Sequence, residues 1–116
     1  MWYNGFTISR EDAMATGKSY LTFILDQLSE VDGISHRQMM GEYIIYKNGR
    51  IIAYLCDNRM LIKPTKHAIL TLPNAPLVAP YEGARAMILV ENTEDREFLK
   101  ELFDIVYPDL PAPKKK

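Results

Sequence analysis

Hydrophobic residues in the middle of this 116-residue chain alternate in the way strands do. The stretch 39–64 holds two apolar runs, rich in β-branched and aromatic residues, that are joined at Asn48-Gly49. An Asn-Gly pair between such runs is a strong hairpin signal, because a type I′ turn needs positive φ at both central residues. Asp57-Asn58 marks a second turn, since both residues tolerate the left-handed conformation. We therefore predict an antiparallel three-strand meander, over about 42–47, 50–56 and 59–63.

These two turns also predict which side chains share a face of the meander. If Lys47 lies opposite Arg50, then Ile44 lies opposite Ala53, and side chains alternate between the faces with period two. The nearly all-apolar face, which we expect to carry the helices, holds Ile44, Tyr46, Ile51, Ala53, Leu55, Met60 and Ile62. The other, mixed face holds Tyr43, Ile45, Lys47, Arg50, Ile52, Tyr54, Cys56, Arg59, Leu61 and Lys63. A slip of one residue would exchange the two sets.

Helical periodicity is found on both sides of the meander. A first helix over about 16–30 has the apolar stripe Tyr20, Leu21, Ile24, Leu25, Leu28 and Val31, and Gly33 stands where a C′ glycine belongs. A short helix over about 65–72 begins at the candidate N-cap Thr65. The last helix is capped by Asn92 or Thr93 and ends before Pro108. Its buried stripe is predicted to be Phe98, Leu99, Leu102, Phe103, Ile105 and Val106.

Further strands are predicted at 34–40, before the meander, and at 85–90, inside the sheet, with an edge strand near 77–79. The order is a helix, three or four strands, a short helix, one or two strands and a helix. This pattern indicates an α+β fold of two layers with an antiparallel sheet of about five strands. We divide the chain into an N-terminal extension (1–13), one domain (14–107) and a Pro/Lys-rich tail (108–116).

Charge and composition narrow the classes of function. The net charge of −1 gives no general basic field, so direct binding to DNA is not expected. The single cysteine fits a reducing compartment, and no apolar run has the length of a membrane span. No secretory signal is visible at the N-terminus. We therefore expect a soluble cytoplasmic protein without membrane contact.

Few residues suggest a reaction. Glycine-rich phosphate loops and a GxSxG motif are absent from the sequence. Cys56 has the basic neighbour Arg59, which lowers a thiol pKa, but a small semi-buried hydrophobic residue is the favoured interpretation. His36 and His67 stand far apart, so we expect no metal site, and we predict no cofactor and no catalytic residues. An enzyme that uses Cys56 or His36 is kept as an alternative.

The mixed face is the best candidate for a binding surface, because exposed apolar patches usually mark interfaces. The candidate interface residues are Tyr43, Ile45, Lys47, Arg50, Ile52, Tyr54, Arg59, Leu61 and Lys63. We expect residues 1–13 or a second copy of the chain to cover the mixed face. Its basic residues, Lys47, Arg50, Arg59 and Lys63, suit an acidic partner. Glu42, at the end of the apolar face, is a candidate structural polar residue, and we expect Arg37 or Lys63 to be its ion-pair partner.

An ordered set of short motifs resembles one family. They are Met39-Met40-Gly41-Glu42-Tyr43, Asp57-Asn58-Arg59, Lys63-Pro64-Thr65 and Pro80-Tyr81-Glu82-Gly83-Ala84, preceded by Tyr20-Leu21 and Asp26-Gln27-Leu28. This set is similar to the N-terminal domain of the TfoX/Sxy family and covers about 14–107. The resemblance implies the order α-β-β-β-α-β-β-α and a stand-alone copy of that domain. Two-domain members are regulators of natural competence, thought to act with the cyclic-AMP receptor protein, and no catalytic residues are known for the family.

The resemblance and the residues together suggest a non-enzymatic regulatory or protein-interaction module. Such a module acts through a protein partner or through self-association as a homodimer, rather than by catalysis. The alternative is a small-ligand binding protein that uses the mixed sheet face or a groove beside Tyr81-Glu82.

Overall fold

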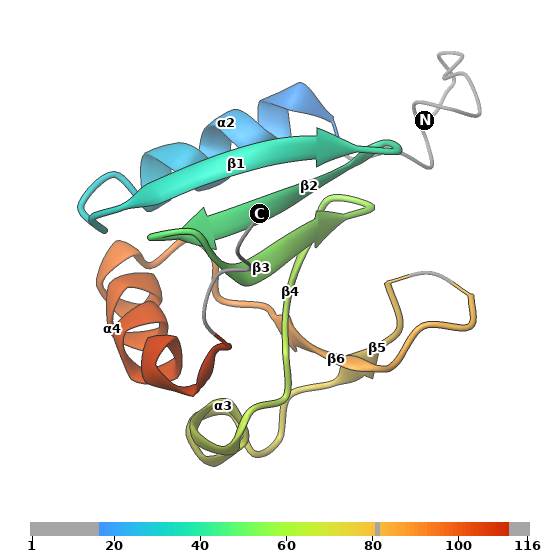
Figure 1. Ribbon diagram of the computed structural model, residues 1–116, viewed down its shortest axis with the longest axis vertical. Helices are drawn as coiled ribbons and strands as arrows, with labels where there is room; N and C mark the ends of the chain where they lie inside the picture. Colours follow the sequence, from blue (N-terminus) through green and yellow to red (C-terminus); the bar gives the residue numbers. More distant parts are fainter. Residues whose placement is uncertain (1–16, 81, 112–116) are drawn as a thin grey trace.

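The computed structural model describes residues 17–80 and 82–111 of the chain (Figure 1). One six-stranded antiparallel sheet runs in the order β1-β2-β3-β4-β6-β5. The strands are β1 (Ile34–Met39), β2 (Glu42–Lys47), β3 (Arg50–Cys56), β4 (Arg59–Ile62), β5 (Leu77–Val78) and β6 (Met87–Val90). The helices are α2 (Lys18–Gln27), α3 (Lys66–Thr71), α4 (Arg96–Val106) and the 3₁₀ turn η1 (Tyr107–Asp109). The predicted α+β class is confirmed, with six strands in place of about five.

Four consecutive strands, β1 to β4, are joined by tight turns. The two predicted turns have positive φ at both central residues, 52° and 82° at Asn48-Gly49 and 55° and 56° at Asp57-Asn58. A third turn of this kind joins β1 to β2 at Met40-Gly41, with φ of 54° and 83°. It was not predicted as a turn, because methionine gives no turn signal. The resemblance implies three strands before the short helix, and the described chain has four.

The register of the meander departs from the prediction at a β-bulge between β2 and β3. Lys47 lies opposite Arg50 as expected, but the register shifts between Ile45 and Tyr46. Ile44 therefore lies opposite Tyr54 rather than Ala53. The extra residue in β3, Ile52, exchanges the faces of β2 and of the start of β3 relative to the rest of β3. The predicted faces are right for β3 from Ala53 onward and for β4, and wrong for β2 and for 50–52.

The larger of two hydrophobic clusters in the described residues lies between the sheet and the helices, and we call it the helix-side core. From the strands it includes Tyr43, Ile45, Ile52, Ala53, Leu55, Met60, Ile62, Ile88 and Val90. From the rest of the chain it includes Leu21, Ile24, Leu28, Val31, Ala68, Leu99, Leu102, Phe103, Val106 and Leu110. The predicted helical stripes are confirmed in their main positions, whereas Ile105 is 39% exposed. Burial of this set supplies the main drive for folding.

The helix ends show which caps were predicted correctly. Thr65 caps α3 as expected, and its Oγ1 accepts a hydrogen bond from the Ala68 amide at 3.3 Å. Asp95, rather than Asn92 or Thr93, caps α4 by accepting a bond from the Phe98 amide at 3.1 Å. Gly33 is not the C′ residue of α2, since that helix ends at Gln27. Gly33 has φ of 78°, and a Cβ there would collide with the Asn48 side chain.

At its C-terminal side the predicted domain ends earlier than the described structure does. The N-terminal extension, 1–13, lies outside the described residues. The predicted tail begins at Pro108, but Tyr107–Asp109 forms η1 and Leu110 is buried in the helix-side core. In the described part of the chain, no helix is long and apolar enough to cross a membrane.

Candidate functional site

The second face of the sheet carries none of the described helices, and we call it the helix-free face. A smaller buried cluster, Cys56, Leu61 and Met87, lies on it, with Tyr54, Val78 and Leu89 packed alongside. Cross-strand partners share a face, so Ile44 joins this face through Tyr54 and Arg59 joins it through Cys56. Strand alternation adds Glu42 and Lys63. The face is thus apolar at its centre and carries both acidic and basic groups.

Only four of the predicted interface residues lie on this face, namely Tyr54, Arg59, Leu61 and Lys63. Tyr43, Ile45 and Ile52 are buried at 4%, 0% and 2% exposure in the helix-side core, so they cannot form a binding surface. The bulge is the physical reason, because Ile52 is its extra residue and the faces of β2 are exchanged relative to the later part of β3. Sequence reasoning missed Ile44, Met87 and Arg85, because their position depends on the bulge and on the pairing of β6.

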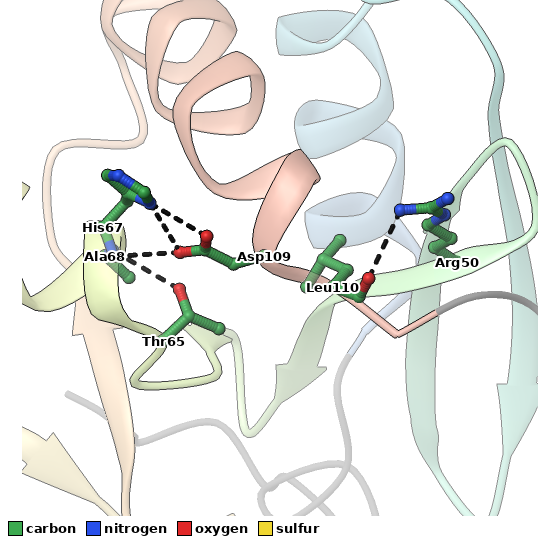
Figure 2. A network of polar contacts seen from close by, with 6 residues as sticks. All are labelled: Arg50, Thr65, His67, Ala68, Asp109 and Leu110. Carbon is green, nitrogen blue, oxygen red and sulfur yellow. Dashed lines mark hydrogen bonds and ion pairs between the residues drawn. The ribbon is translucent and has the colours of Figure 1, made fainter.

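Lys47 and Arg50 lie around the ring of Tyr107 on the other face. The Lys47 Nζ lies 5.3 Å, and the Arg50 Cζ 4.8 Å, from the ring centroid. Lys47 donates to the Asp32 carbonyl at 2.8 Å. Arg50 donates to the Leu110 carbonyl at 3.2 Å (Figure 2). Such cation–π contacts and hydrogen bonds hold the C-terminal segment against the β2–β3 hairpin. The predicted interface role of these two residues is therefore replaced by a structural one.

His67 and Asp109 form a pair that joins α3 to η1 (Figure 2). The Asp109 carboxylate lies 2.8 Å from the His67 Nδ1 and accepts a bond from the His67 amide at 2.9 Å. The bonds from the His67 amide and ring, with a further one from Thr65, lower the pKa of Asp109. Within 17–80 and 82–111, no group of three or more His, Cys, Asp or Glu residues is placed to hold a metal ion.

Cys56 and Glu42 meet at the end of the helix-free face. Burial, and after it the nearby Glu42 carboxylate, raise the pKa of the Cys56 thiol to about 12. The thiol is 1% exposed, so it stays protonated and packs as a small apolar residue. Neither Arg37 nor Lys63 forms an ion pair with Glu42 among the described residues. His36 is the other residue of the enzyme alternative. It packs edge-on against Tyr43, with the two ring centroids 6.3 Å apart.

A cavity of about 510 Å³ lies at the β4–β6 side of the helix-free face. Tyr54 and Met87 line it from the sheet, and Lys63 lines it at the point where β4 has ended. Pro80 and Arg85 line it from the segment that leads into β6. This cavity has the size of a site for a small molecule.

Strand β1 is the longer of the two edge strands of the sheet (Figure 1). Its residues from Ser35 to Met39 are all exposed, on both faces of the strand. Met39 is 45% exposed and Met40, in the turn, is 95% exposed. No strand of the described residues pairs with the outer edge of β1. An edge of this length is a ready template for pairing with another strand.

A backbone hydrogen bond tells which backbone groups of β1 face outward. Beside the first residue of β1, the Gly33 carbonyl accepts from the Asn48 amide at 2.8 Å, so the backbone groups of Gly33 point toward β2. Antiparallel ladders alternate from one residue to the next. The amides and carbonyls of Gln38, His36 and Ile34 therefore point away from the sheet.

These features define a class of protein, a two-layer α+β domain with helices on one sheet face and an exposed edge strand. A protein of Spirochaeta aurantia, described as an uncharacterized 12.7 kDa protein in the trpE 5′ region, is 33% identical to this chain over 102 residues. The match spans 87% of this chain and 89% of that protein, so the chain belongs to the same family as that protein. No protein-family profile matches the chain. No solved structure matches it either.

Proposed function

We propose that the protein is a non-enzymatic regulatory module that works by binding a protein partner or a second copy of itself through β1. The observation that carries this proposal is the exposed outer edge of β1, with unshielded side chains on both of its faces. Adding a strand to such an edge is a common mode of recognition, in which backbone hydrogen bonds supply affinity. The exposed Met39 and Met40 side chains add adaptable apolar contacts beside it.

The resemblance to the N-terminal domain of the TfoX/Sxy family supports a regulatory role. The motif set from Met39-Met40-Gly41 to Lys63-Pro64-Thr65 falls in β1 to β4 and the connection to α3. The first of these motifs forms the exposed end of β1 and its turn, which suits a surface that a partner recognises. The near-neutral charge of the chain favours a protein partner over direct contact with DNA. The single cysteine suits action in the cytoplasm.

Replacement of Gln38 tests this proposal, because its backbone points outward and its side chain is exposed. Gln38→Pro removes the outward N–H, and an edge strand tolerates proline. Gln38→Ala is the matched control, because it changes the side chain and keeps the N–H. Association is measured by light scattering across a concentration series and by affinity purification with quantitative mass spectrometry. We expect Gln38→Pro to lose the self-association or the retained partner, and Gln38→Ala to keep it.

Two results would contradict the proposal. One is a wild-type chain that is monomeric throughout and retains no specific partner. The other is equal association of wild type, Gln38→Pro and Gln38→Ala. Thermal unfolding of both variants shows that any loss comes from the edge rather than from the fold.

A further inference from the structure

We propose that the cavity beside β4 and β6 binds a small organic anion, a carboxylate attached to an aromatic or apolar body. At about 510 Å³, the cavity falls within the range of small-molecule sites. Its lining from the sheet comes from Tyr54 of β3 and Met87 of β6, and β2 lies between β3 and the exposed β1 edge. The inference is therefore independent of the partner surface proposed above.

The charge of the anion is inferred from the two cations that line the cavity. Lys63, which is half-buried, and Arg85, which is exposed, both line this one cavity. Neither forms an ion pair among the described residues. By contrast, Arg96 is paired with Asp26 at 2.6 Å, and Arg59 approaches Asp57 at 3.9 Å. Two cations that line one cavity attract a carboxylate, and a guanidinium binds it in a bidentate fashion.

The apolar part of the ligand is inferred from the walls. Met87 is 7% exposed and belongs to the buried cluster of the helix-free face. The half-buried Tyr54 lies beside it, and Pro64 and Pro80 complete an apolar lining. Aromatic rings stack on tyrosine, and a methionine sulfur makes favourable contacts with a ring. An inorganic anion would leave these walls unused, so the lining selects for an organic body.

The test uses benzoate as the probe and the methyl group of Met87 as the reporter. The full chain is labelled with ¹³C at its methionine methyl groups and titrated with benzoate, followed by NMR spectroscopy. Benzyl alcohol supplies the same ring without the charge, and inorganic phosphate supplies charge without the ring. Lys63→Gln and Arg85→Gln remove one cation each. Lys100→Gln, an exposed lysine of α4 outside the cavity, is the matched control.

We expect benzoate to shift the Met87 signal with saturation, and benzyl alcohol and phosphate to do so more weakly. Lys63→Gln and Arg85→Gln should each weaken benzoate binding by about fivefold, as for a partly solvated ion pair. Lys100→Gln should bind as the wild type does. An unmoved Met87 signal, an equal response to benzyl alcohol or phosphate, or equal affinities in all variants would overturn the inference. If benzoate does not bind, the result of the association experiments with the Gln38 variants still stands. If those variants associate as the wild type does, the result of the benzoate titration still stands.

Discussion

Cys56 shows how one residue type can suggest chemistry that its surroundings remove. The neighbouring Arg59 favours a reactive thiolate in the sequence, and in the structure it does lower the thiol pKa. Burial and the carboxylate of Glu42 act in the opposite direction and outweigh it. The interpretation of Cys56 as a packed apolar residue follows from this balance of desolvation and charge.

The reactivity of Cys56 toward a thiol reagent such as DTNB should reflect this pKa. With a pKa of about 12, the native thiol at pH 8 should react about a thousandfold more slowly than the thiol of the unfolded chain, whose pKa is ~8.5. Glu42→Gln should raise the native rate, because it removes a charge that raises the pKa. Stopped-flow absorbance with and without urea measures both effects. Equal rates for the folded and unfolded chain would contradict them.

Residue-level signals in the sequence identified some turns and caps and left others ambiguous. Asn48-Gly49 and Thr65 were predicted because their chemistry suits one backbone conformation. Before α4, Asn92, Thr93 and Asp95 are all suitable caps, so propensity alone cannot select between them. Packing of the helix on the sheet decides where its first turn lies, and Asp95 then stands at the cap.

At the level of single elements, the start of α4 gives a direct test of this cap. Asp95→Ala should lower the free energy of unfolding by about 1 kcal/mol, because the bond to the Phe98 amide is lost. Asn92→Ala, the cap expected from the sequence, is the control and should have a much smaller effect, since Asn92 is exposed and outside the helix. Urea unfolding followed by circular dichroism measures both. A larger loss for Asn92→Ala would mean that the helix begins earlier.

The β2–β3 pair explains why the candidate surface was predicted only in part. Turn chemistry fixed the pairing of Lys47 with Arg50 correctly. The extra residue beside Ile45 and Tyr46 has no turn-like signal, because bulges are made by ordinary strand residues as well as by glycine. Both faces of β2 are apolar, so the pattern could not show which residues face the helices. Strand β4 has no bulge, and its face assignment was right.

For the whole molecule, the C-terminal segment joins parts of the fold that are far apart in the sequence. Asp109 binds α3, while Tyr107 and Leu110 contact the β2–β3 hairpin through Lys47 and Arg50. From the sequence, most of this segment was predicted to belong to a Pro/Lys-rich tail. Proline and lysine dominate its composition, and the isolated apolar Leu110 gave no periodic signal. Long-range contacts of single residues are the part of a fold that local patterns do not predict.

The pH dependence of stability should reflect Asp109. Its pKa is lowered in the folded chain, so its contribution is present above the unfolded value of ~3.9 and is lost as the pH falls through the folded pKa. Asp109→Asn should therefore lower the melting temperature at neutral pH and have less effect in acid. Melting curves of wild type and variant between neutral and acidic pH measure this difference. A constant difference at all pH values would contradict the assignment.

The helix-side core has a consequence for synthesis of the protein, because it unites residues from Leu21 to Leu110. A chain still attached to the ribosome lacks its final helix and Leu110 until they leave the exit tunnel. Until then the β1–β4 meander has an uncovered apolar surface, the kind of surface that chaperones recognise. Closure of the helix-side core should therefore wait until Leu110 has left the tunnel, rather than proceed strand by strand as the chain emerges.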